Sequence, residues 1–403
     1  MEMSCFCDSF IVKKGIRNII LGSNKKDIDA DSKEMSAEEA AMVFADFEIE
    51  MLKKDYECLS STPQEIVERI CQEVLGQEEA IQKLVHVVYY NQMSNFLEDI
   101  GESAPKRINV LLVGPTGSGK TSSINALKKY FEVPVAKYNA DAITSAGYIG
   151  QKVEDILIRL FEESKRNLAL AERGIIFIDE FDKKAEQITS AGKDINGKAV
   201  QEELLKILEP NTIDLKLHDN TKVQFYTGRL TVILGGAFVG LDDIRKKRLC
   251  KTALGFGRAN EMSEEEVQKH KFVPQDFIKY GFIPELVGRI VMIDEFRKLE
   301  LEDIMRIMLD GKNSPYREKT HFITNALNVE LQISMKFLEK IAEETLNTGT
   351  GARSLEAKIT NVFYPIIQEI FEHKEDYGIC LIDESGAYEL IFEDVTYYGE
   401  TED

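Results

Sequence analysis

The octapeptide GPTGSGKT at positions 114–121 constrains the fold more than any other feature of the chain. It follows the apolar run 107–114, which predicts a buried strand, and it opens the segment 121–131, which predicts a helix. A glycine-rich loop between a strand and a helix is the P-loop arrangement, in which backbone N–H groups surround phosphate oxygens at a helix N-terminus. A chance glycine turn rarely meets all of these conditions, so the sequence predicts a nucleotide site.

The residue types of this octapeptide suit phosphate binding one by one. Its three glycines let backbone N–H groups approach phosphate oxygens closely. Lys120 supplies a point charge for the β- and γ-phosphates, and the Thr121 hydroxyl can bind Mg²⁺. We therefore expect the nucleotide to contact Gly114, Pro115, Thr116, Gly117, Ser118, Gly119, Lys120, Thr121 and Ser122.

A second apolar run, GIIFID at 174–179, predicts another buried strand that ends in acidic residues. In open parallel sheets, ligands bind at the carboxyl ends of the strands. Asp179 would then bind Mg²⁺, directly or through water, and Glu180 would orient and activate the attacking water. A solvated strand end looks the same in isolation, but the position of this pair after the P-loop favours ATP hydrolysis.

Predicted strands and helices alternate through the middle of the chain. The run 229–236 predicts a third strand, and 152–164 predicts an amphipathic helix. This alternation is typical of an α/β domain with a mainly parallel sheet. After about residue 295 the pattern becomes helical and then ends in two alternating segments, which predict a short β hairpin. We expect an accessory segment and linker over 1–60, a large α/β domain over 61–294, and a smaller, mainly helical domain with an acidic tail over 295–403.

The charge and cysteine usage of the chain narrow its possible partners. The formal net charge is −20, whereas nucleic-acid binding needs clustered Lys and Arg, so no nucleic-acid partner is expected. No apolar run approaches the roughly 18 residues of a membrane span, and no signal-peptide pattern is evident. The six cysteines are scattered without a Cys-x-x-Cys, which fits a reduced, cytoplasmic location.

Further motifs follow in a fixed order, namely VLGQEEA (74–80), the P-loop, GIIFIDEFDK (174–183), LGGAFVGLD (234–242), IKYGFIPELVGRI (278–290) and GTGARSLEAKI (349–359). With this set the chain resembles the ClpX family, ring-forming AAA+ unfoldases that feed the ClpP protease. The resemblance covers roughly four-fifths of the chain, from about Thr62 to Glu384. It implies a homo-hexamer of P-loop AAA+ domains with small C-terminal lid domains, using ATP and Mg²⁺.

The resemblance also assigns residues outside the P-loop. It implies that Leu75 and Gly76 flank the adenine, that Arg289 is a finger given to a neighbouring subunit, and that Arg353 belongs to the second sensor. An oriented guanidinium can neutralise charge that grows on the transferred phosphoryl group. Without the resemblance, either arginine is better interpreted as a surface or ion-pairing residue. The catalytic residues expected are Lys120, Asp179, Glu180, Arg289 and Arg353.

The segment AGYIG at 146–150 resembles the first pore loop of that family. In that interpretation Tyr148 and Ile149 grip the substrate in the central channel, because an aromatic and an aliphatic side chain make apolar contact with almost any polypeptide. The flanking glycines would let the loop move with the nucleotide cycle. The alternative is a tyrosine buried in an ordinary turn.

The polar stretch 252–266 contains Leu254, Gly255 and Phe256. This tripeptide resembles the exposed one with which the family docks into hydrophobic clefts of the ClpP ring. An apolar tripeptide on a polar tether can bury its side chains while the loop absorbs mismatch. The alternative is an ordinary loop with one buried phenylalanine.

The chain departs from the family pattern in its N-terminal and pore segments. The usual four-cysteine zinc-binding domain is reduced to Cys5 and Cys7, so no structural zinc is expected. The segment 211–228 replaces a longer basic loop at the pore entrance, which puts the family's tag preference in doubt. The segment 192–209 resembles the second pore loop, with Lys198 where the family normally has glutamate.

The leading hypothesis is an ATP-driven hexameric unfoldase that translocates unfolded or tagged proteins into a ClpP-type protease. One rival is a stand-alone AAA+ remodelling chaperone without a protease, motivated by the degenerate N-terminus. A second rival, from another class, is a nucleotide-gated scaffold that does not hydrolyse ATP. The intact acidic and arginine motifs argue against that scaffold.

Overall fold

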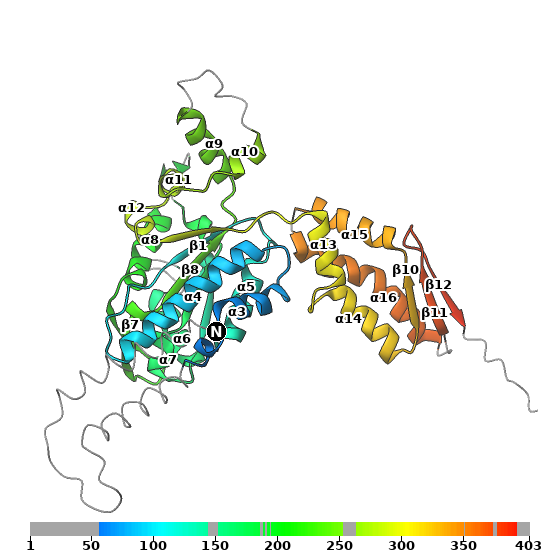
Figure 1. The fold of residues 1–403 in the computed structure, drawn as a ribbon, viewed down its shortest axis with the longest axis horizontal. Coiled ribbons are helices and arrows are strands. Elements are labelled where there is room, and N and C mark those ends of the chain that lie inside the picture. The colour runs from blue at the N-terminus through cyan, green and yellow to red at the C-terminus, as the bar shows by residue number, and fades with distance from the viewer. Residues whose placement is uncertain are drawn as a thin grey trace, which may run out of the picture.

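The computed structural model describes residues 56–143, 152–185, 188–189, 192–193, 195–252, 263–349, 351–373 and 377–392 (Figure 1). Three predicted features lie outside these residues: the pore-loop pair Tyr148 and Ile149, the docking tripeptide Leu254, Gly255 and Phe256, and the cysteines of the N-terminal segment.

The larger domain is built on a five-stranded parallel sheet. Its strands are β1 (Val110–Val113), β2 (Val135–Asn139), β3 (Ile175–Asp179), β8 (Thr231–Gly236) and β9 (Met292–Glu295), in the order β2-β3-β8-β1-β9. Strands covered on both faces are apolar along their whole length, which is why three of them could be predicted as uninterrupted runs. The predicted α/β fold with a parallel sheet is confirmed, while β2 and β9 are additional to the predicted strands.

Helices cover both faces of this sheet (Figure 1). Val110 and Leu112 of β1 pack with one buried cluster, and Leu111 and Val113 pack with the other, because successive strand residues point to opposite faces. The first face carries α3 (Pro63–Cys71), α4 (Glu78–Asp99) and α5 (Lys120–Phe131). The second face carries α6 (Val153–Glu163), α7 (Leu168–Glu172) and α8 (Ile195–Leu208).

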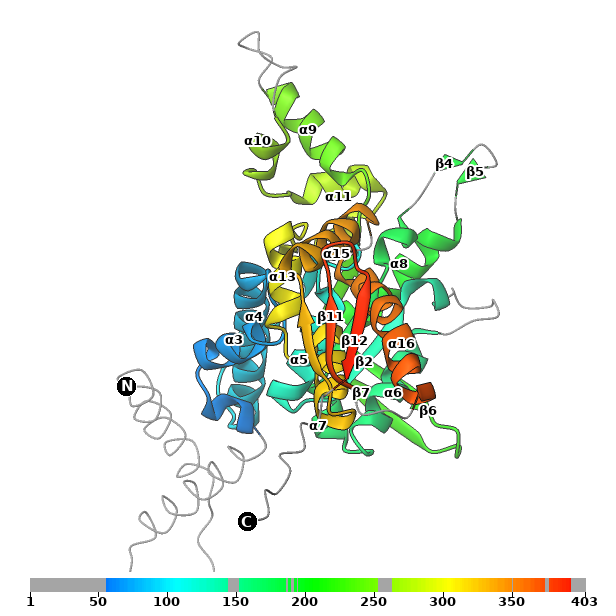
Figure 2. The same cartoon turned by 90° about the vertical axis from the view of Figure 1, so that its right-hand side faces the viewer.

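Shorter elements complete the large domain. Helices α9 (Leu241–Thr252), α10 (Glu264–Gln268) and α11 (Pro274–Tyr280) lie together beyond the sheet and are followed by α12 (Pro284–Val287) (Figures 1 and 2). The segment 211–228 forms the antiparallel hairpin of β6 (Thr212–Lys216) and β7 (Lys222–Tyr226). A smaller hairpin, β4 (Ile188–Thr189) and β5 (Gly192–Lys193), precedes α8. Short 3₁₀ helices are η1 (Glu57–Ser60), η2 (Ala140–Ala142), η3 (Phe181–Lys184) and η4 (Thr227–Arg229).

The smaller C-terminal domain has its own core of buried apolar residues. Its helices are α13 (Leu301–Leu309), α14 (Pro315–His321), the π-helix η5 (Phe322–Ala326), α15 (Met335–Asn347), η6 (Gly351–Ser354) and α16 (Leu355–His373). The predicted hairpin is confirmed as β11 (Tyr377–Ile382) and β12 (Tyr388–Phe392), and β10 (Glu330–Ile333) adds a parallel strand beside it (Figure 2).

The connection between the domains is short. Phe296 packs with the core of the large domain, and Leu299 packs with the core of the small one. Gln77, which is buried, fixes this connection because its side-chain amide donates to the Arg297 carbonyl at 2.8 Å and accepts from the Arg297 N–H at 3.1 Å. In the described part of the chain, no helix is both long and apolar enough for a membrane span.

A buried carboxylate lies one residue before the end of β9. The Asp294 side chain has 0% exposure, and neither of its oxygens has a hydrogen-bond partner among the described residues. Lys83 Nζ lies 3.5 Å from Asp294 Oδ1, which leaves the carboxylate weakly compensated. Burial therefore raises the pKa of Asp294 to about 7.

Candidate nucleotide site

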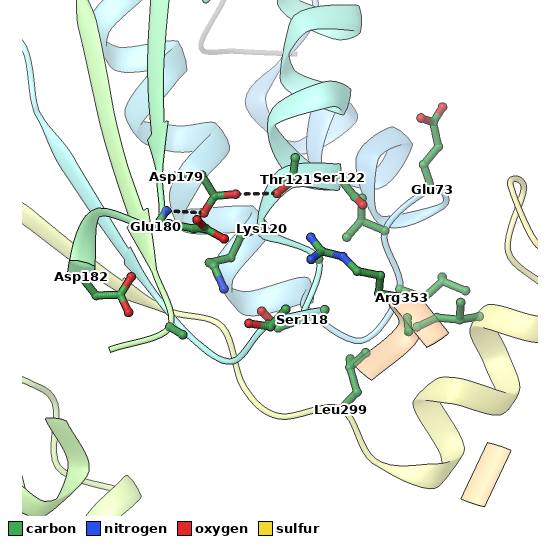
Figure 3. Close-up of a pocket in the computed structure, with 18 of the residues that line it drawn as sticks. Glu73, Ser118, Lys120, Thr121, Ser122, Asp179, Glu180, Asp182, Leu299 and Arg353 are labelled. Carbon is green, nitrogen blue, oxygen red and sulfur yellow. Dashed lines mark hydrogen bonds between the residues drawn. The ribbon is translucent and has the colours of Figure 1, made fainter. Parts of the chain in front are cut away.

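A cavity of about 410 Å³ lies between the two domains at the carboxyl edge of the sheet. Figure 3 shows side chains from both domains pointing into it. The large domain contributes Glu73, Val74, Leu75, Thr116 to Ser122, Asp179, Glu180, Asp182, Lys183 and Ala237, and the small domain side contributes Leu299, Ile307, Ala352 and Arg353. The cavity is within the usual size range of small-molecule sites.

The loop from β1 to α5 has the backbone geometry of a phosphate cradle. Gly117 and Gly119 have φ values of 76° and 101°, in the left-handed region that glycine adopts most easily. Gly119 is the N-cap of α5, so the free N–H groups of the helix start face the loop. Ser118 Oγ is buried and has no hydrogen-bond partner among the described residues, which suits an anion bound in the loop.

Backbone carbonyl groups of this loop hold the Lys120 side chain. Its ammonium donates to the Gly114 carbonyl at 2.5 Å and to the Pro115 carbonyl at 2.9 Å. Burial lowers the pKa of Lys120. Gly114 and Pro115 thus contribute carbonyl groups that position the lysine, and neither lines the cavity itself.

Thr121 and Asp179 form a pair of oxygen ligands. The Thr121 hydroxyl donates to Asp179 Oδ2 at 3.1 Å, and Asp179 Oδ1 accepts from the Glu180 N–H at 2.9 Å (Figure 3). A hydroxyl next to a carboxylate is the oxygen donor set that Mg²⁺ prefers. The residues present therefore fit a magnesium ion at this point.

Glu180 is fixed by two neighbours that the sequence did not reveal. Its Oε2 accepts from Asn139 Nδ2 at 2.6 Å and from Lys183 Nζ at 2.8 Å. These bonds lower the pKa of Glu180, and the bond from Lys183 has the largest effect. The carboxylate is therefore ionised. Asp141 also accepts from Lys183 at 2.8 Å, and Asp141 and Glu180 together raise the pKa of Lys183. Glu180 itself has φ 56°, an uncommon conformation for a residue with a side chain.

Asn139 reaches the site through the pairing of β2 with β3. Asn139 ends β2 directly opposite Asp179 of β3, so both lie at the same carboxyl edge. The register of two parallel strands cannot be read from either strand alone.

The small domain brings Arg353 into the cavity (Figure 3). The approach is close, because a Cβ built on Gly351 would lie 2.8 Å from the Gly117 carbonyl oxygen. Gly351 also has φ 56°, a conformation that residues with side chains rarely adopt, so both the close approach and the backbone conformation favour glycine here. The segment around η6 therefore contacts the backbone of the P-loop.

Besides Gly114 and Pro115, two more predicted site residues lie outside the cavity, Gly76 and Arg289. Gly76 has φ 80°, and a Cβ there would lie 2.8 Å from Asp303 Oδ1, so this glycine permits close packing of the small domain. Its neighbour Leu75 does line the cavity. Arg289 is half-exposed and pairs with Glu209 at 2.5 Å. This position is away from the cavity of its own chain.

A match to a protein-family model identifies the class of protein to which the chain belongs. Residues 105–309 match the family model described as AAA domain (Cdc48 subfamily). The chain is therefore an ATPase of the AAA class, which uses ATP with Mg²⁺.

Three relatives are named ATP-dependent Clp protease ATP-binding subunit ClpX. Those of Borrelia duttonii and Borrelia recurrentis are each 34% identical over 337 residues, covering 80% of this chain and 78% of the relative. That of Treponema denticola is 36% identical over 309 residues, covering 73% and 74%. The chain belongs to the ClpX family, as the motifs predicted.

Proposed function

We propose that the chain is an ATP-driven protein unfoldase and translocase that assembles as a homo-hexamer and passes polypeptides into a ClpP-type protease ring. The observation that carries this proposal is the interdomain cavity, in which the P-loop, an ionised Glu180 and Arg353 face one another. The relatives named as ATP-binding subunits of an ATP-dependent Clp protease support the choice of partner.

The roles of the cavity residues follow from their contacts. Lys120 and the loop N–H groups bind the phosphates of ATP. Thr121 and Asp179 would hold Mg²⁺, which neutralises charge on the β- and γ-phosphate oxygens when bound. Glu180 accepts a proton from the attacking water, and its bonds to Asn139 and Lys183 orient it for that transfer.

The two arginines act at different nucleotide sites, Arg353 at the site of its own subunit and Arg289 at the site of a neighbouring subunit. Arg353 reaches the phosphates from the small domain, so it links the nucleotide to the orientation of that domain. Arg289 serves the site of a neighbouring subunit, where a guanidinium can stabilise charge on the transferred phosphoryl group. Leu75 packs against the adenine, and Gly76 allows the small domain to close over it.

Outside the described residues, Tyr148 and Ile149 form the pore loop that grips substrate, and Leu254, Gly255 and Phe256 dock on the protease. We keep the division into an accessory segment (1–60), an AAA+ domain (61–294) and a lid domain (295–403). We also propose a cytoplasmic protein without structural zinc and without a nucleic-acid partner. A metal assay that finds one zinc per chain would contradict the proposed lack of structural zinc.

The protease partnership is tested with Phe256→Ala. Loss of one docking phenylalanine at each position of the ring removes the centre of the contact. ATP-dependent degradation of a substrate by the mixed ATPase and ClpP rings should fall at least about tenfold, while ATP hydrolysis stays within about twofold. The control is Val239→Ala, another apolar residue that is 82% exposed on the large domain. Undiminished degradation by the Phe256 variant would favour the stand-alone remodelling chaperone.

A further inference from the structure

Gln201 is a fully buried polar residue in α8, with 0% exposure. Its side-chain amide donates to the Lys184 carbonyl at 2.7 Å and to the Gly281 carbonyl at 3.3 Å, and it accepts from the Ile283 N–H at 2.8 Å. All three partners are backbone groups of two segments outside α8, where short helices begin or end. A buried amide with three such bonds fixes the segments relative to its own helix.

The first of these segments carries the catalytic turn. Lys184 ends η3, and the preceding residue, Lys183, holds Glu180 at 2.8 Å. Between Lys184 and α8 the chain makes the β4–β5 hairpin, and β5 begins the segment 192–209 that resembles the second pore loop. The Gln201–Lys184 bond therefore ties α8 to the turn that positions Glu180.

The second segment leads to Arg289. Gly281 follows α11, Ile283 directly precedes α12, and Arg289 lies two residues after α12. The rings of Phe181 in η3 and Phe282 in this segment stack with centroids 5.1 Å apart, which joins the two segments beside Gln201.

The C-terminal end of α8 holds the Arg289 segment as well. Asn109, which is buried, donates through Nδ2 to the Leu208 carbonyl and to the Arg289 carbonyl, both at 3.2 Å. Glu209, the residue after α8, pairs with the Arg289 guanidinium at 2.5 Å. Helix α8 is thus joined to the arginine segment at its middle and at its C-terminal end, and to the Glu180 turn at its middle.

We propose that Gln201 is a positioning residue for ATP hydrolysis, which holds the Glu180 turn and the Arg289 segment in register on α8. The inference rests on the proposed roles of Glu180 and Arg289. Because the same helix follows the β4–β5 hairpin, Gln201 also transmits displacement of that hairpin to both groups. The nucleotide cavity has no contribution from Gln201, so its loss acts on turnover and not on ATP binding.

The test is Gln201→Met, which keeps the side-chain volume and removes all three bonds. We expect kcat for ATP to fall about tenfold or more, because small misplacements of catalytic groups are costly, with the Kd for ATP within about twofold. The matched control is Gln92→Met. Gln92 is 1% exposed and donates to the Arg173 carbonyl at 2.9 Å, before the start of β3, whereas Glu180 follows the end of that strand. It should lose thermal stability to a similar extent and keep kcat within about twofold.

A kcat for Gln201→Met within about twofold of wild type would overturn the proposal, as would an equal fall in Gln92→Met at matched loss of Tm. Gln201→Glu keeps the acceptor for Ile283 and removes both donated bonds, so it serves if the methionine variant does not fold. It too must lower kcat at unchanged Kd, and a normal kcat in this variant overturns the proposal.

A second measurement tests transmission from the hairpin. In wild type we expect casein, as a loosely folded polypeptide, to stimulate ATP hydrolysis, and in Gln201→Met the ratio of stimulated to basal rate should fall toward one. A ratio equal to that of wild type overturns transmission through Gln201. Absence of stimulation in wild type instead contradicts the proposed unfoldase function, whereas the kcat comparison needs ATP hydrolysis alone and still decides the positioning role.

Discussion

Replacing Gly351 by alanine should open the nucleotide site without touching a catalytic group. The added Cβ would lie 2.8 Å from the Gly117 carbonyl oxygen, 3.0 Å from its carbon and 3.2 Å from its Cα. These neighbours are backbone atoms of the P-loop, so they cannot rotate away as a flexible side chain would. The small domain must therefore move back from the loop.

Gly349 offers a matched control in the same loop. Its φ is 68°, close to the 56° of Gly351, but a Cβ built there has nothing within 4 Å. Both alanine variants carry the left-handed backbone penalty of about 1–2 kcal/mol. Only Gly351→Ala adds a collision with the P-loop, and overpacking of this kind costs about 1–3 kcal/mol.

The difference between the two variants isolates the collision. Since each 1.4 kcal/mol is tenfold in an equilibrium constant, the closed arrangement should be weakened by about fivefold to about 140-fold in Gly351→Ala relative to Gly349→Ala. Arg353, Leu299 and Ile307 line the cavity from the small domain, so the loss should appear in the affinity for ATP. The Tm of the two variants should fall by similar amounts.

The assay is equilibrium titration of a fluorescent ATP analogue, with scanning calorimetry as the control for folding. A Kd for Gly351→Ala within about twofold of that for Gly349→Ala would refute the contact between lid and P-loop. A Kd raised equally in both variants would assign the effect to backbone strain alone.

Three further outcomes are expected. Glu180→Gln should bind ATP normally while phosphate release falls about 10²-fold or more, and equal turnover would show that Glu180 is not the base. Tyr148→Ala should leave most ATP hydrolysis intact and abolish unfolding of a tagged fluorescent protein. Normal unfolding by this variant would instead favour the alternative interpretation of Tyr148 as a residue buried in an ordinary turn. Asp294, with its pKa raised to about 7, is more stable protonated, so wild type should lose up to about 4 kcal/mol as the pH rises from 4 to 7. Denaturant midpoints at pH 4 and pH 8 should show this loss in wild type and not in Asp294→Asn.

Local patterns were sufficient wherever neighbouring residues decide the structure. The Thr62 hydroxyl accepts from the Glu65 N–H, and the Glu65 carboxylate accepts from the Thr62 N–H, so two residues three apart in the sequence cap α3. The apolar runs of β1, β3 and β8 were visible for the same reason. Strand β9, by contrast, has only two apolar residues before two carboxylates, so the short apolar run at 290–293 was not predicted as a strand, and β9 pairs with β1.

Contacts between distant segments could not be predicted in this way. The partners of Gln201 lie 17, 80 and 82 residues away along the chain, and Arg289 lies 80 residues from Glu209. Nothing in the composition of either segment selects such a pair, because the contact exists only after the sheet and α8 have packed. The hold of Asn139 on Glu180 belongs to the same class, since it depends on the register of β2 against β3.

The arrangement of the cavity explains why ATP can act on the orientation of the domains. The cavity lacks part of its wall without Leu299, Ile307 and Arg353, so a nucleotide that fills it has more contacts when the small domain is close. A ligand shifts an equilibrium only by its difference in affinity for the two states, and these small-domain contacts supply that difference. Gln77 ties the connecting backbone at Arg297 next to the cavity, so the change in orientation must arise over the few residues that follow. In the proposed mechanism, release of phosphate removes charge near Arg353 and reverses the preference, which gives hydrolysis a mechanical consequence within one subunit.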